Sequence, residues 1–146
     1  MTPKPAVPSR PPPSQSLNAD PPDLVAVSGD LTQRARRREF VAARAMLAAF
    51  EAPVLVVPGN HDVAPWWRPV RRLTGPLDRY RAYITDDLAP TFTRPGLAVL
   101  GVNTAFGATV KGGRIAREAI AQVGHFFAAQ PGAAFKVLVV HHHLAK

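Results

Sequence analysis

The sequence predicts an α/β fold, because short valine-rich runs alternate with segments in which apolar residues recur at helical spacing. Four runs predict buried strands: residues 24–28, 54–57, 97–102 and 135–140. Two segments predict amphipathic helices: residues 36–51 and 117–129. Strands that alternate with helices form a sheet whose polar loops gather at the carboxyl ends of the strands, where α/β proteins build their sites.

The first strand–helix–strand unit is predicted from its apolar pattern and its breakers. The run LVAVS ends at Gly29, which closes the first strand. In the helix that follows, one apolar stripe holds Phe40, Ala43, Leu47 and Phe50, and the arginines 36–38 fall mostly outside it. Pro53 ends this helix, and the second strand, VLVV, runs directly into the loop PGNHD.

The later part of the chain is predicted in less detail. Within residues 64–95 we expect a helix near residues 77–88, and we interpret Trp66 and Trp67 as packing residues. The helix over residues 117–129 places Ile120, Val123 and Phe127 on one face.

The amino-terminal segment differs in composition from the rest. Eight of the 16 prolines lie in the first 22 residues, where they remove backbone donors. We therefore expect residues 1–22 to be a disordered or extended tail and residues 23–146 to form the folded domain.

Composition excludes several classes of protein. A chain of 146 residues is long enough for one core but short for two domains. Without cysteine it forms no disulfide, zinc ribbon or thiol nucleophile, and with no export signal we expect it in the cytoplasm. Its apolar runs are too short to span a membrane, and no membrane partner is expected. The net charge of +8 attracts phosphate-bearing partners.

Three polar clusters each follow directly on a predicted strand. They are Ser28-Gly29-Asp30, Gly59-Asn60-His61-Asp62 and His141-His142-His143. Alone, each is explained by a turn, a helix cap or a set of surface histidines. Together they supply carboxylate, amide and imidazole, a ligand set that suits Mn²⁺, Fe or Zn²⁺.

These clusters resemble the central motifs of the calcineurin-like metallophosphoesterases. The stretches DLVAVSGDLTQ and APVLVVPGNHDV are most similar to the bacterial cyclic-nucleotide phosphodiesterase branch, and the resemblance covers about residues 23–144. It implies a layered α/β sandwich and a phosphoesterase, most naturally a phosphodiesterase, that uses two divalent ions and an activated water.

The resemblance also implies a role for each matching residue. Asp30 would bridge both ions, Asn60 would ligate the second ion, and His141 or its neighbour His142 would complete that ligand set. His61 would face the substrate, oriented by Asp62. A local turn hydrogen bond is the simpler interpretation of an isolated His61-Asp62 pair, but beside Asp30 and Asn60 we favour the functional one.

Two further motifs of the family, Asp-x-His before the first cluster and Gly-His-x-His after the last, do not occur in this sequence. We therefore expect a domain truncated at both ends, a fragment that binds at most one ion and has weak or no activity. One carboxylate offsets little of the charge of two divalent ions.

Two alternatives remain open. A basic module that binds phosphate or nucleic acid is suggested by Arg34 and the arginines 36–38, although a solvated helix face is the better interpretation and no aromatic residues interleave with that run. A non-catalytic homologue would use Trp66 and Trp67 as exposed anchors. Nothing in the sequence indicates an oligomeric state.

Overall fold

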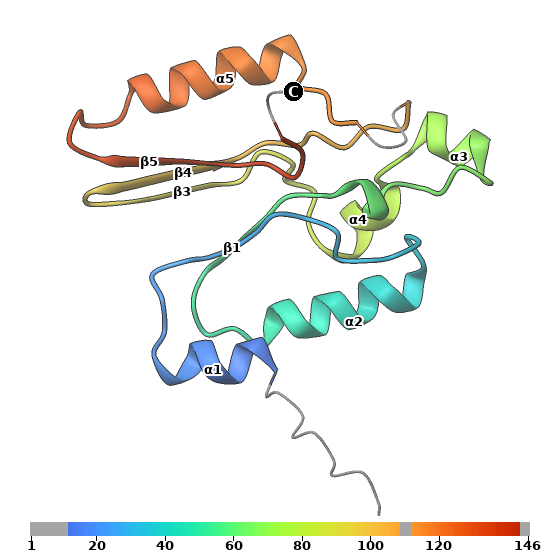
Figure 1. Cartoon of the computed structure of the whole chain (residues 1–146), viewed down its shortest axis with the longest axis horizontal. Helices are drawn as coiled ribbons and strands as arrows, with labels where there is room; N and C mark the ends of the chain where they lie inside the picture. Colours follow the sequence, from blue (N-terminus) through green and yellow to red (C-terminus); the bar gives the residue numbers. More distant parts are fainter. Residues whose placement is uncertain (1–11, 109–111, 144–146) are drawn as a thin grey trace, which may run out of the picture.

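The computed structural model describes residues 12–108 and 112–143, which form layers in the order helix, sheet, sheet, helix (Figure 1). Helix α5 lies over the sheet β3-β4-β5, and helices α2 and α1 lie beyond the sheet β1-β2. Both sheets contain a parallel strand pair, which agrees with the predicted α/β class.

The first sheet comes from the unit that the sequence predicts. Strand β1 (Val25–Val27), helix α2 (Arg37–Ala48) and strand β2 (Val54–Val56) follow one another, and the strands pair in parallel with Val25 opposite Val54. The Glu39 carboxylate accepts hydrogen bonds from the backbone of Arg34 and Arg36, which caps the start of α2.

The second sheet contains one strand that the apolar pattern does not predict. Strands β4 (Leu97–Gly101) and β5 (Phe135–Val139) are parallel and connected through helix α5 (Arg117–Ala128). Strand β3 (Thr91–Arg94) pairs antiparallel with β4 through a turn in which Gly96 has a φ of 82°. Because β3 is polar and lies at the sheet edge, the sequence carries little hydrophobic signal for it.

The core consists of two clusters. One surrounds Phe40 of α2 and Tyr80 of helix α4 (Asp78–Tyr83), both fully buried. The other lies between the sheets, where Leu55 and Val57 meet Val99 and Val139. This second cluster holds the two sheets face to face.

Part of the predicted tail is helical, so that prediction is wrong for helix α1 (Pro13–Ala19). Pro13 occupies the first turn, where the missing backbone N–H costs no hydrogen bond. The Asn18 side chain donates to Ala49 O at 2.8 Å and accepts from Glu51 N at 3.1 Å, which attaches α1 to the end of α2. Residues 1–11 of the expected tail lie outside the described residues.

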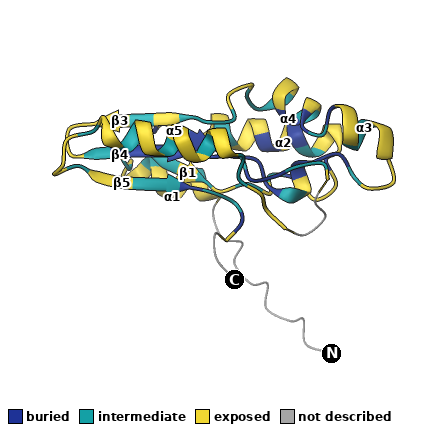
Figure 2. Cartoon of the chain, turned by 90° about the horizontal axis from the view of Figure 1, so that it is seen from above, coloured by how far each residue is buried: buried dark blue, intermediate teal, exposed yellow. Residues whose placement is uncertain are grey.

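Other expectations fail in the region between the two units. Helix α3 (Pro69–Thr74) is not predicted, and α4 is shorter than residues 77–88. Trp66 and Trp67 are not packing residues, since they are 70% and 49% exposed. In the second unit, Ile120 of α5 is also exposed, and none of the residues of this helix is fully buried (Figure 2).

No helix in the described part of the chain is long and apolar enough to cross a membrane.

We predict that Phe40→Ala lowers the free energy of unfolding by about 3–5 kcal/mol, because it leaves a cavity beside Tyr80. Denaturant unfolding measures this loss. Val41→Ala changes the next residue of the same helix at a 49% exposed position and should alter stability by no more than about 0.5 kcal/mol. Equal losses in the two variants would contradict the proposed core.

Candidate functional site

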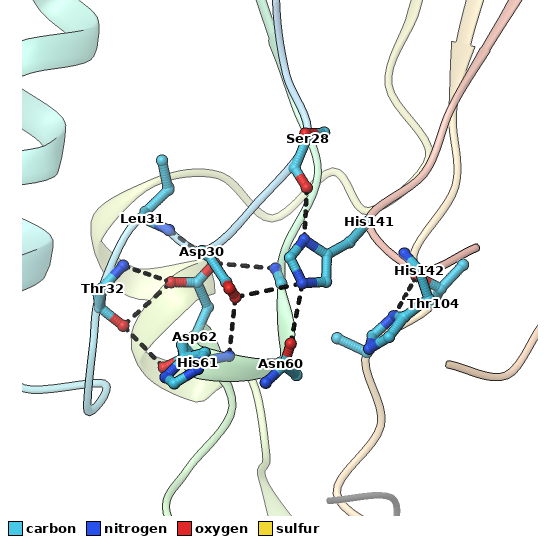
Figure 3. A network of polar contacts seen from close by, with 12 residues as sticks. Ser28, Asp30, Leu31, Thr32, Asn60, His61, Asp62, Thr104, His141 and His142 are labelled. Carbon is cyan, nitrogen blue, oxygen red and sulfur yellow. Dashed lines mark hydrogen bonds and ion pairs between the residues drawn. The ribbon is translucent and has the colours of Figure 1, made fainter. Parts of the chain in front are cut away.

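The polar clusters that follow β1, β2 and β5 meet at one edge of the sandwich (Figure 3). The first two come from the sheet β1-β2, and the third comes from the sheet β3-β4-β5. The predicted convergence of the strand ends is therefore observed, and it depends on how the two sheets pack.

A tight turn aims Asp30 into the site. Gly29 and Asp30 have positive φ values of 97° and 57°, a backbone region that glycine enters freely and aspartate tolerates. The turn lies directly against Gly59, where a Cβ atom would collide with Asp30. The Asp30 carboxylate then accepts a hydrogen bond from His61 N at 3.0 Å.

His141 reaches this cluster from the second sheet. Its Nδ1 lies 2.7 Å from Ser28 O, and because a carbonyl oxygen only accepts, Nδ1 is the donor. In the neutral ring Nε2 then presents a lone pair. That atom lies 2.9 Å from Asn60 Oδ1 and 3.4 Å from Asp30 Oδ1. Three acceptor atoms thus converge, an arrangement that a proton or a bound cation would stabilise.

His142 points away from the acceptor cluster. Its Nδ1 lies 2.8 Å from the hydroxyl of Thr104, and its Nε2 is buried without a hydrogen-bond partner in the described structure. Burial lowers the pKa of the His142 imidazole, and the neighbouring His141 lowers it further. Of the two candidate histidines, the structure therefore brings His141, and not His142, to Asp30 and Asn60.

Asp62 does not orient His61 as expected. One oxygen of its buried carboxylate accepts from the backbone and hydroxyl of Thr32, and the other accepts from Leu31 N and Gly59 N. Burial raises the pKa of the Asp62 carboxyl, although these four hydrogen bonds oppose the shift. The functional interpretation of Asp62 is corrected: it joins the loops after β1 and β2, as in the simpler turn interpretation.

His61 is held by a different partner and opens onto a cleft. Its Nδ1 lies 2.9 Å from Gln33 O, so Nδ1 is the donor and Nε2 is left for a ligand. The side chain is exposed and lines a cleft together with Asn60, Trp66 and Trp67. The exposed imidazole of His61 therefore lies beside Asn60 of the acceptor cluster.

Sequence reasoning missed three residues that hold side chains of the polar clusters, which are Thr32, Gln33 and Thr104. Thr104 could have been suspected, since it lies just beyond the carboxyl end of the predicted strand at residues 97–102. Gln33 carried no signal, because only its backbone carbonyl contacts His61.

The described residues contain no group of three or more His, Cys, Asp or Glu side chains placed to hold a metal ion. The acceptor cluster has one carboxylate and one imidazole, and its third acceptor atom is the amide oxygen of Asn60.

Two sheets packed face to face, flanked by helices and carrying this cluster at their strand ends, define a fold of the α/β metallophosphoesterase type. A family model described as calcineurin-like phosphoesterase matches residues 14–145, and the chain belongs to this family. Over 72 residues the chain is 38% identical to the glycerophosphodiester phosphodiesterase GpdQ of Enterobacter lignolyticus (strain SCF1). The match covers 47% of this chain and 26% of that relative. The predicted family and fold class are thereby confirmed.

We predict that Asp62→Asn lowers the free energy of unfolding by about 3 kcal/mol, since an amide nitrogen would face donors that now meet a carboxylate oxygen. Asp86→Asn is the matched control, because that side chain is 85% exposed. Thermal unfolding of both variants measures the effect. If Asp62→Asn leaves stability unchanged, Asp62 does not join the two loops.

Thr104→Val keeps the shape of the side chain but removes the partner of His142 Nδ1. We expect a loss of about 1–3 kcal/mol in unfolding free energy, because both ring nitrogens would then lack hydrogen bonds at a buried position. The exposed Thr93→Val in β3 is the control. Chemical denaturation decides, and equal stability of the two variants would refute the role of Thr104.

Proposed function

We propose that this chain carries part of the active site of a metal-dependent phosphodiesterase. In this proposal Asp30, Asn60 and His141 hold a divalent ion, and His61 faces the substrate. The observation that supports it is the convergence of three acceptor atoms. His141 Nε2 lies 2.9 Å from Asn60 Oδ1 and 3.4 Å from Asp30 Oδ1.

The donor set fits a divalent metal. The hydrogen bond to Ser28 O fixes the tautomer in which His141 Nε2 has a free lone pair, which is the form that ligates metals. Carboxylate, amide oxygen and imidazole suit Mn²⁺, Fe²⁺ and Zn²⁺. With a single carboxylate to offset positive charge, we expect one ion rather than two to bind this chain.

When bound, such an ion neutralises phosphoryl charge and lowers the pKa of water. The residues of the chain then position the substrate. His61 directs Nε2 outward because Gln33 O engages Nδ1, and in its protonated form it donates to a phosphoryl or leaving oxygen. The Gly29–Asp30 turn and its close contact with Gly59 keep the Asp30 carboxylate in place.

A phosphodiester is the substrate class we favour. The relative that is 38% identical over 72 residues is a glycerophosphodiester phosphodiesterase by name, and the net charge of +8 favours an anionic ligand. Cyclic nucleotides belong to the same chemical class.

We further infer that other residues complete the site in the full protein. The chain spans only 26% of that relative, and the acceptor cluster has fewer anionic ligands than two ions require. Translating the encoding DNA in all frames for Asp-x-His upstream and Gly-His-x-His downstream tests this inference.

The proposal is tested by Mn²⁺ binding measured with titration calorimetry. We expect about one ion per chain, and His141→Ala should weaken binding by roughly 10- to 100-fold, since loss of even a supporting partner costs that much. His143→Ala is the matched control because its exposed side chain is two residues away. Equal affinity of the two variants would remove His141 from the proposed ligands.

Hydrolysis of a generic aryl phosphodiester with added Mn²⁺, beside Asp30→Ala, then tests activity. Turnover that requires both Asp30 and metal supports the enzyme, whereas phosphate binding that weakens steeply with salt and ignores Asp30→Ala supports the basic-module alternative.

A further inference from the structure

A cleft of about 260 Å³ opens beside the acceptor cluster and contains both tryptophans of the sequence. Asn60 and His61 line this cleft together with Trp66 and Trp67. Because Asn60 and His61 also belong to the proposed site, a phosphate bound there would lie at the cleft, and a group esterified to it could occupy the space lined by the tryptophans.

The two tryptophans of the cleft are exposed. The rings of Trp66 and Trp67 pack edge to face, with centroids 5.7 Å apart and planes at 85°. This contact fixes one ring against the other but leaves the residues 70% and 49% exposed. Two large apolar rings held in a fixed arrangement at a cleft provide faces on which a planar group can stack.

The electrostatics of the cleft select an anion. Among the described residues its lining includes Arg34 and Arg72 but no acidic side chain. Arg72 donates to Ala64 O at 2.6 Å and so supports the loop that carries the tryptophans. A ligand with a phosphate at His61 and a flat apolar group against the indoles would satisfy both features.

We propose that Trp66 and Trp67 form a subsite for the alcohol group of the phosphodiester and that this subsite prefers a planar aromatic group to an aliphatic one. The proposal rests on the proposed function for the position of the phosphate. Arg34 contributes charge that attracts either kind of diester, and the indoles contribute the selectivity for shape.

Tryptophan fluorescence tests this directly, because Trp66 and Trp67 are the only tryptophans in the sequence. The probes are diphenyl phosphate and dicyclohexyl phosphate, which have equal charge but planar and puckered rings, titrated into the chain with and without Mn²⁺. We expect diphenyl phosphate to bind roughly five- to tenfold more tightly than dicyclohexyl phosphate, because stacking on an aromatic side chain stabilises a complex by about that factor.

Variants test whether Trp66 and Trp67 cause the preference for the planar ring. Trp66→Leu and Trp67→Leu, each with the other tryptophan as reporter, should reduce the preference for the planar ring, whereas Leu73→Ala at an exposed position outside the cleft should not. Arg34→Gln should weaken both probes by the same factor. Circular dichroism confirms that each variant is folded.

Equal affinity for the two probes, no binding of either, or a preference that survives both tryptophan variants would overturn the subsite. Sedimentation at rising protein concentration provides a further check: a fluorescence change that follows self-association without ligand would mean that a second copy covers the indoles. The proposed function fails separately, if Asp30→Ala leaves Mn²⁺ binding unchanged while the preference for the planar ring persists.

Discussion

The site exists because two sheets pack against each other. Leu55 and Val57 on one side and Val99 and Val139 on the other form the apolar contact between the sheets. Val139 ends β5, and the chain delivers His141 two residues later to Ser28 O, 113 positions away in sequence. Apolar burial, which has no directional chemistry of its own, thus sets where the imidazole lies.

The loops within the first sheet add the precision that packing alone lacks. Asp62 is buried and joins the loops after β1 and β2 through hydrogen bonds to Leu31, Thr32 and Gly59. A carboxylate can accept all of these donors at once, and these hydrogen bonds offset part of the cost of burying it. The conspicuous Asn-His-Asp sequence therefore combines one residue in the acceptor cluster, one exposed in the cleft and one that is structural.

Sequence reasoning predicts those parts of the molecule that depend on local pattern. The strands at residues 54–57 and 135–140 are recognisable because they are apolar, and the polar clusters at their ends follow from the connectivity of parallel strands. The direction of a side chain is not a local property. Asp62 and His142 turn toward Thr32 and Thr104, and although both threonines lie beyond strand ends, no spacing rule shows which side chain each of them contacts.

The same limit explains the errors outside the site. The proline content of the amino-terminal segment predicts an extended chain. Helix α1 nevertheless forms, because Pro13 is compatible with a first helical turn and the Asn18 side chain makes hydrogen bonds to the backbone that follows α2. Composition identified Trp66 and Trp67 as apolar, but whether an apolar ring packs or faces solvent depends on the fold around it.

An ion held by Asp30, Asn60 and His141 would connect the loops of the two sheets, since the first two residues follow strands of the sheet β1-β2 and the third follows a strand of the sheet β3-β4-β5. Ligand binding to the folded state alone stabilises that state, so occupancy of this cluster and the apolar contact between the sheets would reinforce each other.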